Sequence, residues 1–414
     1  MNDGLFPTRD GYWFDLEKAL RVVAFIELLP QWKGPLAGQP LKLLPWQHEL
    51  VCLLFGCVDE AGLRQYRTAF VFVPRKGGKT HTAAAIALAL LFIDGEEGAE
   101  IYSAAHDRDQ AAICFDVAAG MVKRLPELRA ASRTIDHTKR ILHPATDGFY
   151  RAISADAAGS HGFNASAVVF DELHTQRNRD LWDALLTSTA ARAQPLVVAI
   201  TTAGWDRESI CWEVYDYATK VQAGVIEDPT FLPVIFEADK DDDWTSEEVW
   251  RKANPGLGVT VPLSYFETEC EKAREMPAYQ NTFRRLLLNQ WTEQADRWID
   301  LSVWDRCDGE VDPGTLEDRE CYAGLDLSTT TDISAFVMVF PPVAGEPLQV
   351  VPFFWIPEDN AHQRSRRDGV PYDAWLRDGW MKSTEGSVVD YDCLRADINE
   401  LGESFNIREI EVPP

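Results

Sequence analysis

The sequence is short of basic side chains: 40 Lys and Arg residues stand against 66 Asp and Glu residues, and the formal net charge is -26 at pH 7. This imbalance excludes a globally basic protein that holds nucleic acid by neutralising phosphates over its whole surface, so any contact with nucleic acid must be local. Residues 211–414 hold 41 of the 66 acidic residues but only 18 of the 40 basic ones. We interpret this asymmetry as a sign of separate modules in the two halves.

Cysteine motifs and long apolar runs are also lacking. The eight cysteines form no C-x-x-C pair and have no histidines at zinc-finger spacing, so we expect reduced thiols and no structural zinc site. The longest apolar run, Ala83 to Ile93, is too short to cross a bilayer, and the N-terminus carries acids where a signal peptide carries bases. These absences predict a soluble cytoplasmic protein that makes no membrane contact.

The chain is long enough, at 414 residues with 46% hydrophobic residues, for a large core and at least two domains. Short apolar runs rich in β-formers alternate with longer helical stretches in its first half. Such alternation predicts an α/β fold with a buried, mostly parallel sheet covered on both faces, with ligands beyond the carboxyl ends of its strands. The predicted strands are residues 68–74, 100–105, 150–154, 167–172 and 195–203.

The second half changes character twice. Residues 205–300 combine an acidic, solvated loop with a helical stretch broken at Pro277, which we interpret as a lid and linker. A fresh strand pattern begins at Cys321 and is followed by a second apolar run, and the two predict an antiparallel pair. We therefore predict three domains, at residues 1–210, 211–300 and 301–414.

A phosphate-binding turn is predicted where the first strand meets an Ala-rich helix. The turn reads Pro74-Arg75-Lys76-Gly77-Gly78-Lys79-Thr80. Its backbone N–H groups can surround phosphate oxygens, Lys79 can reach the β- and γ-phosphates, and the Thr80 hydroxyl can bind Mg²⁺. Because Val73 stands where the standard motif has its first glycine, a purely structural turn remains an alternative.

Two adjacent carboxylates, Asp171 and Glu172, end the apolar run of residues 167–172. Unpaired carboxylates at the end of a buried strand would be costly, so a function or exposure to solvent must account for them. In the functional interpretation Asp171 holds the water shell of Mg²⁺ and Glu172 polarises the water that attacks the γ-phosphate. The alternative is an acid pair that faces solvent.

Five further candidate residues are supported less strongly by their own residue types. Thr201 and Thr202, in the segment Thr201–Gly204, could sense the γ-phosphate, and the Gln47 amide could read an adenine edge. Arg75 could supply positive charge to the transferring phosphoryl group, and Arg192 could do so across a subunit boundary. An ordinary turn, a surface glutamine and solvated arginines are the corresponding alternatives.

Asp326 is the main candidate of the second half, because it lies inside an apolar strand where an unpaired carboxylate is expensive. Gly324, two residues earlier, leaves room on the same face for a cation or a nucleic-acid backbone. Two-metal phosphodiester cleavage needs several carboxylates, and an edge-strand aspartate facing water is the alternative. The other acids available are Asp332, Asp390, Asp392 and Asp397.

Taken in order, these segments resemble the large subunit of tailed-bacteriophage terminases, the motors that package DNA into proheads. The resemblance extends over nearly the whole chain, and several of its motifs have no role that the residues alone suggest. The segments are GQPLKLLPWQ, PRKGGKT, VVFDE, ITTAG, KANPGLG, TFRRLLLNQW, WIDLSVWDRC and YAGLDLSTTTD.

The resemblance implies an additional-strand P-loop ATPase domain, a lid and a ribonuclease-H-like nuclease domain. It places Gln47 at the adenine, Arg75 with the phosphate loop at the phosphates of ATP, and Asp171 and Glu172 in the Walker B position with Mg²⁺. It places Thr201–Gly204 in a segment that couples hydrolysis to movement, and Asp326 as the first acid of a nuclease that uses Mg²⁺ or Mn²⁺. The implied partners are double-stranded DNA, the portal protein, the small terminase subunit and further copies in a ring on the prohead, within the host cytoplasm and not in the mature virion.

One departure affects the nuclease. The family pattern expects a second aspartate at the end of the next core strand and a third near the C-terminus. Pro413 occupies the place of the second and the sequence ends at Pro414, so we expect an incomplete nuclease that cuts little DNA alone. A helicase-like DNA-dependent ATPase is an alternative, although no second ATPase-like domain is visible after residue 210. A nucleotide-dependent assembly scaffold without nuclease activity is another.

Overall fold

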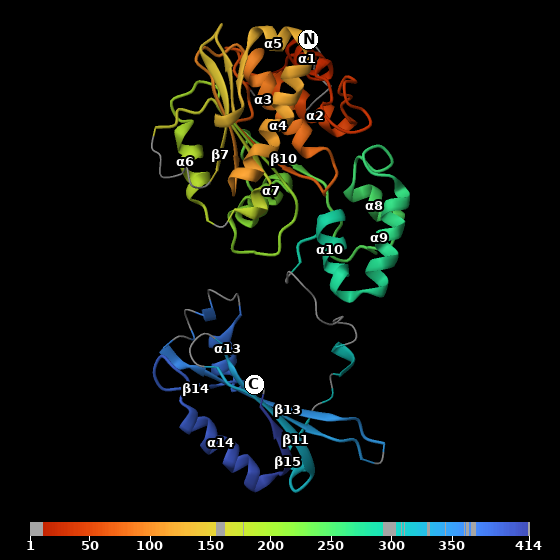
Figure 1. Ribbon diagram of the computed structural model, residues 1–414, viewed down its shortest axis with the longest axis vertical. Coiled ribbons are helices and arrows are strands. Elements are labelled where there is room, and N and C mark those ends of the chain that lie inside the picture. Colours follow the sequence, from red (N-terminus) through yellow and green to blue (C-terminus); the bar gives the residue numbers. More distant parts are fainter. Residues whose placement is uncertain are drawn as a thin grey trace. The chain divides into compact units, whose positions relative to one another are not determined.

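The computed structural model describes residues 11–154, 162–176, 178–292, 304–307, 309, 311–328, 332–343, 345–359, 361, 364–365 and 370–412. The chain divides into two compact units, Met1–Asp300 and Leu301–Pro414 (Figure 1). Among the described residues, no helix is both long enough and apolar enough to cross a membrane.

The first unit is built on an eight-stranded sheet with the strand order β10-β3-β9-β8-β4-β7-β6-β5. Neighbouring strands from β10 to β7 run parallel, and β6 and β5 extend the sheet as antiparallel strands. Its strands are β3 (Thr68–Phe72), β4 (Glu100–Ala105), β5 (Arg133–Ile135), β6 (Arg140–His143), β7 (Gly148–Ser154), β8 (Ala167–Asp171), β9 (Leu196–Thr201) and β10 (Phe231–Ile235).

Helices cover both faces of this sheet, and the hydrophobic core accordingly forms two clusters. One cluster packs α1, α2, α3 and α4 against side chains such as Val71 and Val169. The other packs α6 and α7 against side chains such as Phe72 and Phe170. Because β3, β8 and β9 are buried on both faces, they have continuous apolar sequences, and the predicted α/β class is confirmed. The helices are α1 (Leu16–Leu28), α2 (Pro45–Gly56), α3 (Lys79–Phe92), α4 (Arg108–Arg124), α5 (Pro126–Ala131), α6 (Asp180–Ser188) and α7 (Ile210–Gln222), and a short pair, β1 (Trp13–Phe14) and β2 (Cys57–Val58), lies beside them.

The strand β10 lies in the segment that the sequence led us to interpret as lid and linker. It pairs in parallel with β3, so the sheet continues past residue 210. Pro233 is tolerated because β10 is an edge strand, where one side of the backbone makes no ladder hydrogen bonds. The strand is apolar like the others, but the proline inside it and the acidic sequence that follows spoke against a strand.

Three helices follow β10 and enclose a small core of their own around Trp250, Phe266 and Phe283. The predicted break at Pro277 is confirmed: α9 ends at Glu275, and α10 begins at the proline, which has no N–H to donate and is therefore suited to a first helical turn. The bounds of these helices are α8 (Glu247–Ala253), α9 (Leu263–Glu275) and α10 (Pro277–Leu287).

The second unit contains a five-stranded mixed sheet with the strand order β14-β13-β12-β11-β15. The predicted antiparallel pair is confirmed: β12 runs antiparallel to both β11 and β13. The outer strands β15 and β14 run parallel to β11 and β13. The elements are β11 (Glu320–Asp326), β12 (Ser334–Phe340), β13 (Gln349–Pro357), α13 (Tyr372–Arg377), β14 (Lys382–Thr384), α14 (Tyr391–Ser404) and β15 (Asn406–Glu411).

The two faces of β11 differ in burial. Cys321 and Ala323 are buried in a core to which α14 contributes Leu394, whereas Tyr322, Gly324 and Asp326 alternate with them and are exposed. Alternation of this kind is expected for a strand with one face on a core and one face open. Asp326 therefore lies on the open face of a central strand.

Candidate functional site

The turn between β3 and α3 closes tightly over its own first residues. Lys76 and Gly78 have positive φ angles of 69° and 86°. A Cβ on Gly77 would lie 2.4 Å from Val73 Cγ1, and one on Gly78 would lie 2.8 Å from Gln47 Nε2. The two glycines are therefore required by close approach, and Val73, where the standard motif has glycine, packs beneath the turn.

Lys79 begins α3 and is folded into this turn. Its side chain is 5% exposed, and Nζ donates to the carbonyl oxygens of Val73 (3.0 Å) and Pro74 (3.2 Å). Nζ also lies 3.8 Å from Glu172 Oε1. Burial lowers the pKa of Lys79, while the charges of Glu172 and Asp171 oppose that shift. The structure thus brings the predicted phosphate loop and the predicted carboxylate pair together, with β9 between their strands.

Asp171 ends β8 as a buried carboxylate, and it is 5% exposed. Burial, and next the charge of Glu172, raises its pKa to about 7, while a hydrogen bond with the Thr80 side chain acts in the opposite direction. Its Oδ1 atom has no hydrogen-bond partner. A buried carboxylate oxygen without a partner is costly, and carboxylate and hydroxyl oxygens are ligands that Mg²⁺ prefers. Asp171 and Thr80 therefore fit the predicted cation.

Glu172 follows in a left-handed conformation, with φ of 55°. Its Oε2 lies 3.2 Å from His174 Nδ1 and accepts a hydrogen bond from Thr202 Oγ1 at 3.4 Å. Burial by itself would raise the pKa of Glu172, but the His174 hydrogen bond and the Lys79 charge lower it to about 2. The carboxylate is therefore ionised throughout the physiological range and can only accept hydrogen bonds.

Thr201 ends β9 and Thr202 follows it, beside the carboxylates. Thr201 Oγ1 accepts the backbone N–H of His174 at 3.0 Å and lies 3.1 Å from its Nδ1 atom. His174 was missed by the sequence interpretation, although it stands two residues after Glu172 in the first turn beyond the strand. The only sequence signal for it was a polar ring in the short helical turn Leu173–Thr175.

Gln47 is buried beside the phosphate loop and is not a surface residue. Its Oε1 accepts the backbone N–H of Leu44 at 2.8 Å, and its Nε2 donates to Thr82 Oγ1 at 2.8 Å. Arg75 and Lys76 are exposed on the loop. The backbone N–H of Arg75 donates to the carbonyl oxygen of Leu286 at 2.8 Å, which ties the loop to α10.

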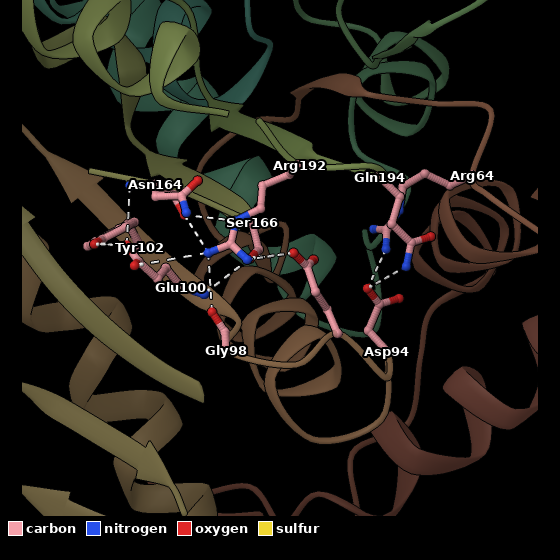
Figure 2. Close-up of polar contacts among 10 residues, drawn as sticks. Arg64, Asp94, Gly98, Glu100, Tyr102, Asn164, Ser166, Arg192 and Gln194 are labelled. Atoms are coloured by element: carbon pink, nitrogen blue, oxygen red, sulfur yellow. Dashed lines mark hydrogen bonds and ion pairs between the residues drawn. The ribbon is translucent and has the colours of Figure 1, made fainter. Parts of the chain in front are cut away.

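Arg192 does not join this cluster within its own chain, and its predicted action across a subunit boundary stays a prediction. It lies at the opposite ends of the parallel strands, where β4 and β8 begin (Figure 2). Its side chain is 13% exposed and donates to Glu96 Oε1 (3.0 Å), to the carbonyl oxygen of Gly98 (3.2 Å) and, through two nitrogens, to that of Asn164 (3.0 and 2.8 Å). The guanidinium group is thus committed to contacts within its own chain.

The segment Leu286–Trp291, within a motif that had no assignable role, contacts the end of β9. The Asn289 side chain is fully buried; its Oδ1 accepts the Ala203 backbone N–H at 2.8 Å and its Nδ2 donates to the Phe236 carbonyl oxygen at 2.9 Å. Trp291 stacks on Phe72 at the end of β3, with ring centroids 6.2 Å apart. The segment therefore connects α10 to two strand ends of the candidate site.

The carboxylates of the second unit are dispersed. Asp326 is exposed, so the expected cost of burying it does not arise. Asp397 accepts the Trp355 Nε1–H at 2.8 Å, and Trp355 is buried in the core on the other face of the sheet. Asp390 caps α14 and Asp392 pairs with Arg395. No group of three or more potential metal ligands occurs in the described part of the chain, and Pro413 lies outside it.

Comparison with known protein families gives two matches. The model of the terminase large subunit ATPase domain matches residues 45–220, and the model of the terminase large subunit endonuclease domain matches residues 225–414. The second match contains the whole five-stranded sheet and corrects the expectation of an incomplete nuclease domain. That expectation depended on Pro413 in the place of the second aspartate and on the lack of a third acid after it.

Individual proteins give the same result. The chain is 34% identical over 397 residues to the terminase large subunit of Enterobacteria phage HK97, which covers 94% of this chain and 75% of that protein. It is 26% identical over 261 residues to protein YmfN of Escherichia coli (strain K12), covering 61% of this chain and 57% of that protein. The crystal structure of the HK97 bacteriophage large terminase is similar with a TM-score of 0.59 and 32% identity, covering 95% of this chain and 79% of that one.

Proposed function

Because the chain belongs to the terminase large-subunit family, with an ATPase domain and an endonuclease domain, we propose that it is the ATP-hydrolysing motor that moves double-stranded viral DNA into a prohead. The observation that carries this proposal is the approach of Lys79 Nζ to Glu172 Oε1, at 3.8 Å. This approach joins the phosphate loop after β3 to the carboxylates after β8. One triphosphate can therefore contact both.

Each residue of this site has a role that its position supports. The backbone N–H groups of Gly78 and the first turn of α3 would donate to the phosphates, and Lys79 would exchange its carbonyl partners for phosphate oxygens. Thr80 and Asp171 would hold Mg²⁺, and the ion would supply positive charge that offsets the charge of the phosphates. Glu172 accepts a hydrogen bond from the attacking water and orients it toward the γ-phosphate.

The two remaining residues of the proposed site differ in how they can act. Arg75 is exposed and free to bring its charge to a phosphoryl group, as hydrolysis requires. Gln47 can contact adenine only by exchanging its Nε2 hydrogen bond to Thr82. In the absence of that exchange, Gln47 supports the turn at Gly78, where its Nε2 atom closes off the space for a side chain.

The endonuclease domain supplies a second proposed activity. We assign Asp326 as a ligand of the Mg²⁺ or Mn²⁺ used in cleavage, because it lies on the open face of β11, where a DNA backbone can approach. Gly324 on the same face has no atom within 4 Å of the position that a Cβ would take, so it leaves that approach clear. The further partners we propose are the portal protein, the small terminase subunit and further copies of this chain in a ring, assembled in the host cytoplasm.

Steady-state ATPase and prohead packaging assays test the motor. Lys79→Ala and Glu172→Gln should each lower ATP turnover by at least about 100-fold, because they remove phosphate binding and water orientation. Lys42→Ala and Glu60→Gln, at exposed positions outside the site, are the matched controls and should retain wild-type turnover. Wild-type turnover in Glu172→Gln would refute the assignment of the site.

Cleavage is tested by plasmid cutting in Mn²⁺. The wild-type chain should cut DNA, and Asp326→Ala should abolish cutting while ATP turnover remains unchanged, because the two sites lie in separate units. Cutting that persists in Asp326→Ala would show that other acids hold the metal.

A further inference from the structure

His174 contacts both the carboxylate at the end of β8 and the hydroxyl at the end of β9. Its Nδ1 atom lies 3.2 Å from Glu172 Oε2 and 3.1 Å from Thr201 Oγ1. Its backbone N–H donates to the same Thr201 oxygen at 3.0 Å. The imidazole is 10% exposed, so these contacts are shielded from solvent.

The backbone brings these groups together at a cost. Glu172 adopts a left-handed conformation that non-glycine residues rarely occupy, and the next three residues form a single turn of 3₁₀-helix. Thr175 Oγ1 donates to the Glu172 carbonyl oxygen at 2.8 Å and closes this turn. The reversal returns His174 to the end of β9, whereas a continued strand would have carried it away.

The proton on His174 follows from the partners. A carboxylate oxygen can only accept, so a favourable contact at 3.2 Å requires a hydrogen on Nδ1. Glu172 Oε2 is then held by His174 and by Thr202 Oγ1, while Oε1 is turned toward Lys79. One oxygen is fixed and the other faces the phosphate loop.

We propose that His174 is a positioning residue: its Nδ1–H group holds the Glu172 carboxylate in the orientation that accepts the attacking water, and its contacts with Thr201 link that orientation to the end of β9. This proposal rests on the proposed role of Glu172 in ATP hydrolysis. A displacement of Thr201 by the γ-phosphate would move the same imidazole that holds Glu172. Activation of the attacking water would then depend on the position of Thr201 at the end of β9.

Three substitutions separate this role from simple packing. Asparagine places its Nδ2 atom where histidine has Nδ1, whereas glutamine places its amide one bond further, near the position of Nε2. We expect His174→Ala and His174→Gln to lower kcat for Mg-ATP hydrolysis by about 10- to 100-fold, with KM changed less than about threefold. His174→Asn should restore kcat to within about threefold of wild type.

The measurements are steady-state ATP hydrolysis by the full chain, affinity for a fluorescent ATP analogue and the midpoint of thermal unfolding. Equal kcat in His174→Ala and wild type overturns the proposal, as does a His174→Asn variant as slow as His174→Ala. A loss that appears in KM and analogue affinity, with kcat preserved, also overturns it. Glu172→Gln, measured in parallel, tests the proposed function separately: loss of turnover there with no effect at His174 refutes only the positioning role.

Discussion

Replacing Arg192 by alanine tests whether this side chain is a structural anchor or a catalytic group supplied to a neighbouring subunit. The substitution removes four hydrogen bonds, to the Glu96 carboxylate and to the carbonyl oxygens of Gly98 and Asn164. Glu96 keeps a hydrogen bond from Ser166 Oγ at 3.0 Å, so its charge is not left wholly without a partner. The Glu96 carboxylate and the two carbonyl oxygens would nevertheless lose the guanidinium group as their hydrogen-bond donor.

The magnitude follows from these contacts. Hydrogen bonds to charged groups contribute about 1.5–3 kcal/mol each and neutral ones about 1 kcal/mol, and the loss of several in one network is less than additive. The 13% exposure of Arg192 and the 19% exposure of Glu96 let water recover part of the loss. We therefore expect Arg192→Ala to lower the free energy of unfolding by about 3 kcal/mol, which lowers the unfolding midpoint of a unit of this size by about 6 °C.

The assay is thermal unfolding followed by circular dichroism, combined with ATP turnover per folded molecule well below the midpoint. Arg192→Lys keeps the charge but not the planar fork and should lose about half as much stability. Arg129→Ala, at an exposed position, is the control and should shift the midpoint by less than about 1 °C. A wild-type midpoint together with lost turnover in Arg192→Ala, restored by mixing with subunits defective in Lys79, would refute the anchor and establish action between subunits.

Two further predictions concern polar side chains that pack near the ends of β9 and β10. Asn289→Ala leaves the buried Ala203 N–H without its acceptor and should lower the free energy of unfolding by about 3 kcal/mol. Asn289→Gly should lose about 1 kcal/mol less, because Asn289 has a φ of 58°, which glycine adopts readily. Equal unfolding midpoints for the wild type and both variants would contradict this. Burial raises the pKa of Glu237 to about 7, above its unfolded value of about 4.5, so its contribution to stability is complete below pH 4.5 and is lost as the pH rises to 7. Glu237→Gln can keep a hydrogen bond with Tyr215 but cannot titrate. It should therefore remove about 2 kcal/mol of the change in unfolding free energy between pH 5 and 8, followed through the unfolding midpoint. A pH profile equal to that of the wild type would count against the burial of this carboxyl.

Local signals sufficed for the elements around the phosphate loop. The apolar runs that became β3, β8 and β9 are buried on both faces, so their composition alone indicated a parallel sheet. The glycines after β3 and the acids after β8 could be assigned because each sits at a strand end. The same reasoning failed for β10, because it is an edge strand that contains Pro233 and is followed by acidic sequence.

Residues whose role depends on distant partners could not be assigned in this way. Asn289 meets Ala203 across 86 positions of sequence, and Arg192 meets Glu96 across 96. Contacts between residues so far apart in the sequence produce no periodic pattern from which they could be predicted. For Asp326 the expectation of burial was wrong for a different reason. Its strand is central in the sheet, as expected, but one face of that strand is open, so a central strand did not imply a buried side chain.

Backbone strain and unpaired charge coincide at one edge of the first sheet. Lys76, Glu172 and Asn289 are non-glycine residues with positive φ, and all three adjoin the ends of β3, β8 or β9. Asp171 Oδ1, a buried carboxylate oxygen without a hydrogen-bond partner, lies at the same edge. Each such feature costs on the order of 1–3 kcal/mol, and the surrounding core must offset it. Because a bound cation would give Asp171 Oδ1 the partner that it lacks, ligand binding should stabilise this unit more than its contact area alone implies.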